Sequence, residues 1–305
     1  MQTLTELLVK RAEFIQSIRS FMKAQGILEV DTPLLGKRTV TDPHIQSIAT
    51  RCGRYLQTSP EFFMKRLLSQ GVGDCFQLNK AFRAEECGRK HSHEFTLLEW
   101  YRLGFSLPEL MQEVARLMTY LLGVDKFDYI TYQALFLREL QIDPFDTSLK
   151  EVTTLAKKHI DINMQSEDID DWLDLLLTHL IEPSLGMNRP VFLYAYPPSQ
   201  AALARLSSHQ QTTVAERFEL YYKGVELANG FDELTDYQQQ LQRFNEDNLY
   251  RAQIGLSTVE LDEDFLAALE KGLPAAAGVA VGVDRLMMLK WQHDSLAEVI
   301  PFYHG

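Results

Sequence analysis

Apolar side chains near the start of the chain recur every three or four residues. They are Leu4, Leu7, Leu8, Ile15, Ile18 and Phe21. This spacing predicts an amphipathic helix from Thr3 to Gln25. Thr3 and Glu6 are spaced as in a capping box at the start of a helix, and Gly26 favours its end.

The pattern then changes to strands and short helices. The apolar run at 27–30 predicts a strand, and the segment 59–68, which begins with serine and proline, predicts a second helix with the serine as N-cap. Strand-like runs at 75–83 and 94–103 flank a polar loop at 84–93 that is rich in charge and histidine. Long hairpin loops of this composition more often have a functional role than a structural one.

The rest of the chain adds a helical stretch and further strands. Residues 107–180 are mainly helical in pattern, and we interpret them as an insertion or accessory layer. Strand-like runs follow at 191–196, 217–222, 225–234 and 278–281. A polar helix is expected at 236–253, and a turn at Gly282 leads into a helix that starts near Val283. Helices grouped around strands with short connections predict an α+β fold with an antiparallel sheet. No Gly/Ser/Pro-rich linker is present, so residues 1–305 are expected to form a single domain.

Composition narrows the class of protein. Of the 305 residues, 46% are hydrophobic and 24% are charged, which is typical of a globular protein. Three cysteines without a C-x-x-C pair argue against a disulfide scaffold or a zinc site and favour a reducing, cytoplasmic compartment. No apolar run is long enough for a membrane span. The formal net charge of −12, without a basic cluster, argues against nucleic acid as the main partner.

The loop after the first long strand carries candidate nucleotide-binding residues. Phe82-Arg83-Ala84-Glu85 ends that strand, and His91-Ser92-His93-Glu94-Phe95 begins the next. An arginine at the end of a strand is suited to hold a phosphate during in-line attack, and Phe95 can stack on a nucleobase. By itself, however, F-R-x-E is more often a surface hairpin with a salt-bridged arginine.

A second cluster reads RFELYYKGVELANGFDEL, from Arg217 to Leu234. It contains three glutamates among aromatic and small residues: Glu219, Glu226 and Glu233. Carboxylates in such surroundings need a metal ion or an ammonium group as a partner. Mg²⁺ needs only one or two carboxylates besides ATP phosphates, so Glu219 and Glu226 would suffice. A regular strand would direct Glu226 away from Asn229, Phe231 and Glu233. A shared pocket therefore requires a bulge or twist in Ala228-Asn229-Gly230. Solvated glutamates on an edge strand are the alternative.

The third cluster is Gly278-Val279-Ala280-Val281-Gly282-Val283-Asp284-Arg285. Small residues at a strand-to-helix turn allow a ligand to approach the backbone closely. The G-x-x-x-G spelling is weak evidence by itself. Arg285, in the first turn of the helix that follows, is explained equally well as a surface arginine.

Together and in this order, the clusters resemble the three signature motifs of class II aminoacyl-tRNA synthetases, in the lysyl branch. The first helix and the strand ending in Asp31-Thr32-Pro33 resemble motif 1. The hairpin from Phe82 to Tyr101 resembles motif 2, and the segment from Gly278 to Arg285 resembles motif 3. The lysyl-type T-S-P-E-x-x-x-K-R-L segment is present at 58–67. The resemblance spans nearly the whole chain. It implies a six-stranded antiparallel sheet flanked by helices, in a homodimer formed through motif 1 with Pro33 at the interface.

The resemblance also implies roles for individual residues. Arg83 and Arg285 would be catalytic, with Arg83 on the ATP α-phosphate and with Phe95 and Arg285 on either side of the adenine. The ATP-binding residues would be Arg83, Ala84, Glu85, His91, Ser92, Phe95, Glu226, Leu227, Gly282 and Arg285. The substrate-binding residues would be Ser59, Pro60, Glu61, Tyr101, Asn229, Phe231, Glu233 and Ala280. Glu219 and Glu226 would hold Mg²⁺. Glu61 and Glu233 would meet the substrate's side-chain ammonium, because a buried ammonium requires a carboxylate.

Three differences from lysyl-tRNA synthetases narrow the expectation. Ser92 replaces the asparagine of the family's His-Asn-Pro-Glu-Phe. Ala280 replaces a glycine beside the amino acid, and one methyl group in a close-packed pocket changes substrate preference by about 1–3 kcal/mol. The chain begins at the motif 1 helix, so the OB-fold anticodon-binding domain of the family is expected to be absent. These features are similar to the bacterial branch of the family that modifies elongation factor P.

That branch activates (R)-β-lysine with ATP and transfers it to a lysine ε-amine of elongation factor P, which forms an amide. The acidic charge of the chain agrees with a protein acceptor and with no stable tRNA binding. One alternative is a stand-alone lysyl-adenylate-forming enzyme that charges tRNA or another acceptor. An asparagine-synthetase-like activity is disfavoured, because an aspartate side chain needs a cation where this chain has Glu61 and Glu233. A non-catalytic regulatory paralogue would have broken ATP motifs, but this chain keeps Arg83, Glu219, Glu226 and Arg285.

Overall fold

The computed structural model describes residues 3–209 and 212–304. The chain forms two units, one made of residues 1–123 and 233–305 and the other of residues 124–232. Among the described residues, no helix combines the length and the apolar composition of a transmembrane segment. The single domain expected over 1–305 stays a prediction.

The first helix is specified by its own sequence. α1 spans Leu4–Ala24, and Thr3 forms the predicted capping box with Glu6. The Thr3 hydroxyl accepts from the backbone N–H of Glu6 at 3.2 Å, and the Glu6 carboxylate accepts from the backbone N–H of Thr3 at 2.8 Å. The inward face buries Phe14, Ile18, Phe21 and Met22.

The first unit is built on a sheet whose strand order is β1-β4-β5-β11. The strands are β1 (Leu28–Glu29), β4 (Cys75–Phe82), β5 (Glu94–Leu103) and β11 (Ala276–Gly282). β5 pairs antiparallel with both β4 and β11, and β1 pairs parallel with β4. β4 and β5 are the two strands of the predicted motif 2 hairpin, and β11 is the predicted motif 3 strand.

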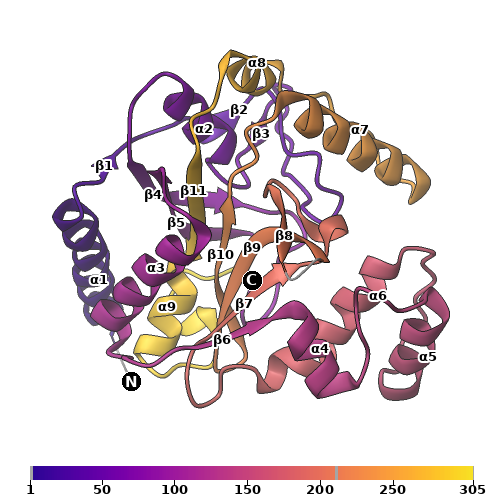
Figure 1. The fold of residues 1–305 in the computed structure, drawn as a ribbon. Helices are drawn as coiled ribbons and strands as arrows, with labels where there is room; N and C mark the ends of the chain where they lie inside the picture. The colour runs from indigo at the N-terminus through magenta and orange to yellow at the C-terminus, as the bar shows by residue number, and fades with distance from the viewer. Residues whose placement is uncertain (1–2, 210–211, 305) are drawn as a thin grey trace. The chain divides into compact units, whose positions relative to one another are not determined.

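Helices pack around this sheet (Figure 1). They are α2 (Glu61–Ser69), α3 (Leu107–Leu122), α7 (Tyr237–Gln253), α8 (Glu263–Lys271) and α9 (Val283–Lys290), with the 3₁₀ turn η4 (Leu296–Glu298) after them. α3 contacts α1 and α9, and α8 contacts α2 and α7. The rings of Phe62 and Phe265 stack between α2 and α8 with their centroids 4.4 Å apart. The short strands β2 (Leu35–Gly36) and β3 (Tyr55–Leu56) pair with each other.

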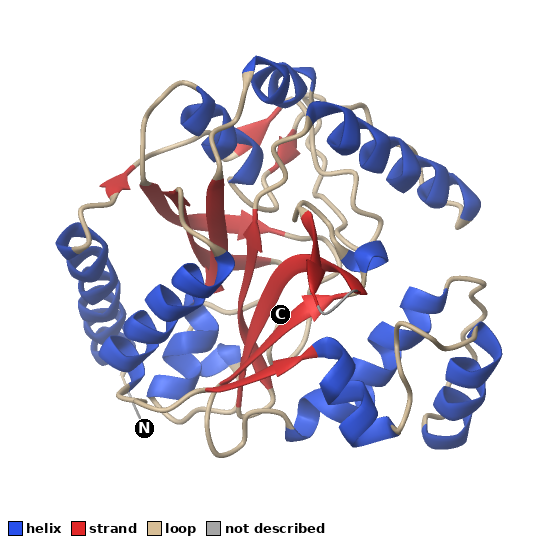
Figure 2. Cartoon of the chain, viewed as in Figure 1, coloured by secondary structure: helices blue, strands red, loops and turns tan. Residues whose placement is uncertain are grey.

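The second unit combines a sheet with a group of helices (Figure 2). Its strands are β6 (Asp128–Thr131), β7 (Val191–Tyr196), β8 (Leu206–His209), β9 (Thr212–Tyr222) and β10 (Val225–Asp232). β9 pairs antiparallel with β7, β8 and β10, and β6 pairs parallel with β7. The helices are α4 (Tyr132–Leu140), α5 (Leu149–His159), α6 (Ile169–Leu176), the π-helix η1 (Leu177–Ile181) and the 3₁₀ turns η2 (Glu182–Ser184) and η3 (Pro198–Gln200). Tyr132, Phe136, Trp172 and Leu193 belong to its core.

The α+β class is confirmed, but the details of the expected sheet are wrong in two respects. Among the described residues, the first unit has four strands in its sheet and the second has five, so the number of strands is larger than the expected six. Two pairs, β1 with β4 and β6 with β7, are parallel. Helices lie between the members of both pairs along the chain, and such crossovers are what parallel pairing requires. The predicted N-cap is also wrong: Pro60 caps α2, and Ser59 Oγ accepts from the Glu61 N–H at 3.1 Å.

Candidate active site

An acidic cluster lies in the first unit, at the start of α2 and on the adjoining face of β5. Glu61 is the first residue of α2. Glu99 and Tyr101 lie two residues apart on β5 and therefore share a face of the sheet. Glu233 joins them from the segment before α7, where its backbone N–H donates to the carbonyl of Ala276 at 2.9 Å. Glu99 and Glu233 are only 3% and 2% exposed, so the cluster is shielded from water.

Lys65 links two of these carboxylates. Its Nζ lies 2.7 Å from Glu61 Oε1 and 2.6 Å from Glu233 Oε2. The spacing from Glu61 to Lys65 is one helical turn, so α2 itself holds this pair together. The side chain of Lys65 is fully buried. Burial alone lowers the pKa of this ammonium, but Glu233 and Glu61 outweigh it and raise the pKa above its ordinary value, so Lys65 is charged.

Glu99 is held by two hydroxyl groups. Ser59 Oγ donates to Glu99 Oε2 and Tyr101 Oη donates to Glu99 Oε1, each at 2.7 Å. Burial, with the charge of Glu61, raises the pKa of Glu99 to about 7. Burial also raises the pKa of Glu233 to about 8, although the charge of Lys65 opposes this shift. The cluster therefore binds protons near neutral pH and has a high affinity for a further cation.

Strand β11 forms the floor beside this cluster. Gly278 pairs with Tyr101 and Ala280 pairs with Glu99 in the antiparallel ladder, so these four residues share one face. A Cβ atom on Gly278 would lie 2.4 Å from Glu233 Oε1 and 2.4 Å from Tyr101 Cε1. Gly278 therefore has to lack a side chain for Glu233 and Tyr101 to reach their positions.

A buried amide lies next to the carboxylates. Gln77 on β4 pairs with Glu99, so the two side chains share a face of the sheet. Gln77 is 1% exposed, and its amide has no hydrogen-bond partner among the described residues. A buried amide without a partner marks a place where a ligand or water binds.

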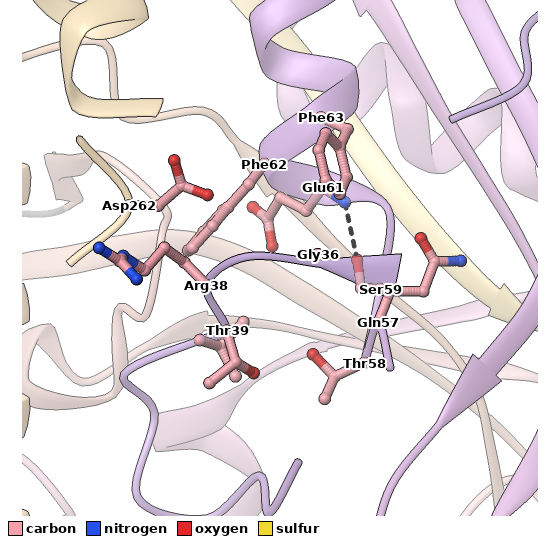
Figure 3. Close-up of a pocket in the computed structure, with 11 residues that line it drawn as sticks. Gly36, Arg38, Thr39, Gln57, Thr58, Ser59, Glu61, Phe62, Phe63 and Asp262 are labelled. Atoms are coloured by element: carbon pink, nitrogen blue, oxygen red, sulfur yellow. Dashed lines mark hydrogen bonds between the residues drawn. The ribbon is translucent and has the colours of Figure 1, made fainter. Parts of the chain in front are cut away.

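A pocket opens beside the start of α2 (Figure 3). Ser59 and Glu61 line it, and the Glu61 N–H donates to Ser59 Oγ across its wall. Thr39, Arg38 and Asp262 supply further polar groups to the lining. Glu61 and Ser59, which donates to Glu99, therefore line both the pocket and the acidic cluster.

The predicted phosphate-binding arginine lies at the end of β4. Arg83 Nη1 donates to Glu86 Oε1 at 2.7 Å, and its guanidinium carbon lies 5.2 Å from the centre of the Phe95 ring. Burial by itself would raise the pKa of Glu86. The charge and hydrogen bond of Arg83 outweigh burial, so the pKa of Glu86 lies below its ordinary value. Burial and the charge of Arg285 lower the pKa of His91. Arg83 and Arg285 thus form a cationic site in which Glu86 balances part of the charge.

Motif 3 contacts the same loop. Arg285 Nε donates to the carbonyl of Lys90 at 3.1 Å. Ser92, at the end of this loop, is 8% exposed, whereas Glu85 is exposed. Ala84 is held by its N–H, which donates to the carbonyl of Gln46 at 2.8 Å.

A buried arginine joins motifs 1, 2 and 3. Arg11 Nη1 on α1 donates to Asp284 Oδ1 at 2.8 Å and to the carbonyl of Val299 at 2.6 Å. Asp284 Oδ2 in turn accepts from the backbone N–H of Thr96 at 2.6 Å. Asp284 precedes Arg285 in α9, and Thr96 follows Phe95 in β5. The network therefore fixes the backbone next to both residues that are predicted to hold adenine.

In the second unit, a β-bulge brings the other predicted residues to one face. The register of β9 and β10 shifts between Glu226, which pairs with Tyr221, and Ala228, which pairs with Leu220. After this shift Asn229 pairs with Glu219. Leu227 is the extra residue, and it turns Asn229 to the same side as Glu226. A bulge that lets Glu226 and Asn229 share a face is therefore present, but it lies at Leu227 and not in the expected stretch Ala228-Asn229-Gly230.

Glu219 is well coordinated within this face. It is 6% exposed, its Oε1 is paired with Arg217, and its Oε2 accepts from the Tyr221 hydroxyl at 2.5 Å. No group of three His, Cys, Asp or Glu residues among the described residues is arranged to hold a metal ion. Two carboxylates on one face therefore fit a metal ion only if ATP and water supply most of its ligands. Asn229 Oδ1 is buried without a partner in the described part of the chain.

The structure brings together most of the predicted residues within each unit. The first unit holds Arg83, Ala84, Glu85, His91, Ser92, Phe95, Gly282 and Arg285, and around the acidic cluster Ser59, Pro60, Glu61, Tyr101, Glu233 and Ala280. The second unit holds Glu219, Glu226, Leu227, Asn229 and Phe231. Sequence reasoning assigned no role to Lys65, Glu86, Glu99 and Arg217. Two spacings in the sequence would have identified Lys65 and Glu99. Lys65 lies four residues after Glu61 on a predicted helix, and Glu99 lies two residues before Tyr101 on a predicted strand.

Comparison with known proteins identifies the family of the chain. The model of the family of class II tRNA synthetases for Asp, Lys and Asn matches residues 1–304. Curated relatives named elongation factor P--(R)-beta-lysine ligase include those of Histophilus somni strain 2336, 46% identical over 305 residues, and Pseudoalteromonas translucida, 48% identical over 306 residues. Both alignments cover 97% of this chain and 94% of the relative. The chain belongs to the class II tRNA synthetase family of the Asp, Lys and Asn type.

Proposed function

We propose that this chain activates (R)-β-lysine with ATP and transfers it to a lysine ε-amine of elongation factor P. The observation that carries the proposal is the acidic cluster of Glu61, Glu99 and Glu233. Glu99 and Glu233 are buried, and the Glu61 side chain is 15% exposed. Three carboxylates with one lysine among them require further positive charge, and a diamino acid provides it. The names of the curated relatives supply the acceptor and the β-amino acid.

The chemistry follows that of an adenylate-forming ligase. The carboxylate of the amino acid attacks the α-phosphorus of ATP, and pyrophosphate leaves. The neutral amine of the acceptor then attacks the carbonyl carbon of the mixed anhydride, an amide forms, and AMP leaves. Arg83 would stabilise the charge on the α-phosphate, while Phe95 and Arg285 hold the adenine. Because Arg83 is paired with Glu86, the phosphate would replace Glu86 as its anionic partner.

The remaining ATP contacts follow from the resemblance of the sequence motifs to those of the family. Glu219 and Glu226 would hold Mg²⁺, which neutralises phosphate charge when it is bound. Ala84, Glu85, His91, Ser92, Leu227 and Gly282 would line the nucleotide. Ser59, Pro60, Tyr101, Asn229, Phe231 and Ala280 would line the amino acid together with Glu61 and Glu233.

The assembly and location form part of the same proposal. Leu4, Leu8 and Val9 on α1 are 45%, 47% and 51% exposed, and a second copy of the chain packed on motif 1 would cover them. A formal net charge of −12 favours a protein acceptor over stable tRNA binding, in the cytoplasm.

One assay separates the proposal from its alternatives. The chain is incubated with ATP, Mg²⁺ and (R)-β-lysine, lysine or no amino acid, and elongation factor P or tRNA is then added. We expect exchange of pyrophosphate into ATP that depends on (R)-β-lysine, and a mass increase on elongation factor P. Arg83→Ala should abolish both. Preferential charging of tRNA would instead favour a lysyl-tRNA synthetase, and no exchange with any amino acid would favour a non-catalytic paralogue.

A further inference from the structure

Lys65 occupies the position in which a substrate ammonium is expected. Its Nζ contacts one oxygen of Glu61, at 2.7 Å, and one oxygen of Glu233, at 2.6 Å. These are the two carboxylates to which the proposed function assigns the ammonium of the amino acid. Lys65 therefore either competes with the substrate or arranges the carboxylates for it.

The exposure of Glu61 favours the second role. Lys65 Nζ is paired with Glu61 Oε1 and Glu233 Oε2, while the Glu61 side chain is 15% exposed and lines the pocket beside α2. Glu233 Oε1 lies against Gly278 on β11, on the face that also carries Ala280. Lys65 thus fixes the orientation of both carboxyl groups, while Glu61 stays accessible from the pocket.

The surroundings keep Lys65 in place. Its Nζ lies 6.0 Å from the centre of the Phe265 ring, which stacks on Phe62. The ammonium is fully buried, so it has no route to water that would let it leave the carboxylates. With all groups ionised, the cluster has two more negative charges than positive ones, which favours binding of a further ammonium group.

We propose that Lys65 is a positioning residue for the amino acid, which holds Glu61 and Glu233 in the orientation that binds the substrate ammonium and sets the charge of the pocket. The proposal rests on the proposed function. Removal of Lys65 would leave Glu61 and Glu233 facing each other without a cation between them, and they would then repel or take up a proton.

The test measures amino-acid-dependent exchange of pyrophosphate into ATP for Lys65→Met, Lys65→Arg and the wild-type chain. We expect Lys65→Met to raise the KM for (R)-β-lysine at least thirtyfold while the KM for ATP stays within twofold. Lys65→Arg keeps the charge but changes the geometry, and it should raise the amino acid KM about fivefold. Arg66→Met is the matched control, because Arg66 is the next residue of α2 and pairs with the exposed Asp264 at 3.3 Å.

The pH profile distinguishes positioning from a merely structural ion pair. The titratable groups that face Lys65 and its partners are Glu61 on α2, Glu99 and Tyr101 on β5, Cys75 on β4 and Glu233 before α7. In Lys65→Met, the acid limb of kcat/KM for the amino acid should move to higher pH, because the carboxylates lose their nearest cation. The acid limb of kcat/KM for ATP should stay at the same pH.

Several outcomes would overturn the proposal. An unchanged amino acid KM in Lys65→Met, an equal rise in the KM for ATP, or the same effect from Arg66→Met would each do so. If Lys65→Met does not fold, Lys65→Arg decides: a wild-type amino acid KM would refute positioning. A wild-type chain that activates neither (R)-β-lysine nor lysine would refute the proposed function itself, whereas activity that is insensitive to Lys65 refutes only this inference.

Discussion

At the scale of single residues, burial determines the chemistry of the acidic cluster. Glu99 and Glu233 have the same carboxyl group as any surface glutamate, but each is at least 97% buried, which raises the pKa of Glu99 to about 7 and that of Glu233 to about 8. At neutral pH the unliganded pocket therefore holds protons that a bound ammonium would replace.

The pH dependence of stability should show these protons. Between pH 5 and 8 the folded chain keeps protons on Glu99 and Glu233 that the unfolded chain has lost, so the free energy of unfolding falls as pH rises. Glu99→Gln cannot ionise and should reduce this slope by about half. Thermal unfolding of both proteins from pH 5 to pH 8 measures this slope. We expect the unfolding midpoint of the wild type to fall by about 3 °C or more over this range. Identical slopes would contradict the assignment to Glu99.

A single methyl group tests the floor of the pocket. In Gly278→Ala the new Cβ would meet Glu233 Oε1 and Tyr101 Cε1 at 2.4 Å, so both side chains must move. We expect the KM for the amino acid to rise at least about tenfold, because displacement of a well-placed contact costs about 1–3 kcal/mol. The KM for ATP serves as the internal reference. A proportional rise in both constants would indicate a general structural defect.

At the scale of elements, long-range polar contacts align the motifs. Arg11 on α1 binds Asp284 at the start of α9, and Asp284 accepts from the backbone of Thr96 in β5. The helix of motif 1 therefore supports the strand and the helix that carry Phe95 and Arg285. In the second unit, the bulge at Leu227 has a comparable role, since it turns Asn229 to the face of Glu219 and Glu226.

Removal of the Arg11 side chain should have large effects. Arg11→Met leaves Asp284, which is 2% exposed, without its cation, and breaking a buried ion pair in this way costs about 3–5 kcal/mol. We expect a lower midpoint of thermal unfolding and a higher KM for ATP. Arg19→Met is the control on the same helix, because Arg19 pairs with Glu29 at 2.8 Å on the surface. If both variants unfold at the same temperature, the buried Arg11–Asp284 pair stabilises the fold no more than the surface pair does.

At the scale of the whole molecule, exposed apolar residues and net charge bear on partners. The outward face of α1 carries Leu8, which is 47% exposed, beside Leu4 and Val9. Leu249 on α7 is also apolar and is 65% exposed. Exposed apolar residues that occur singly are common, whereas a contiguous group of them marks an interface.

A charge placed on α1 tests the proposed homodimer. Leu8→Glu puts a carboxylate in the centre of the apolar group, so we expect a shift from dimer to monomer in light scattering at micromolar concentration. Leu249→Glu makes the same change on α7 and should leave the mass unchanged. A monomeric wild-type chain, or a dimer that is insensitive to Leu8→Glu, would refute an interface on α1.

Much of the fold was predictable because its signals are local. The capping box of Thr3 and Glu6, the strand-like apolar run of β5 and the small residues of β11 all act between neighbours in the chain. Strand alternation also indicated that Glu226 and Asn229 needed a bulge to share a face. The parallel pairing of β6 with β7 was not predictable, because it depends on how the intervening helices pack.

The sequence by itself predicted which residues would carry the chemistry: Arg83, Phe95 and Arg285 around a nucleotide, and carboxylates for an ammonium or a metal ion. Only the tertiary structure decided the state of these groups. Lys65 reaches Glu233, and Arg11 reaches Asp284, across long separations in the chain, and Glu99 acquires its raised pKa from burial. The physical reason is that pairing and desolvation depend on which segments meet in space, whereas sequence patterns report only the neighbours of each residue along one helix or strand.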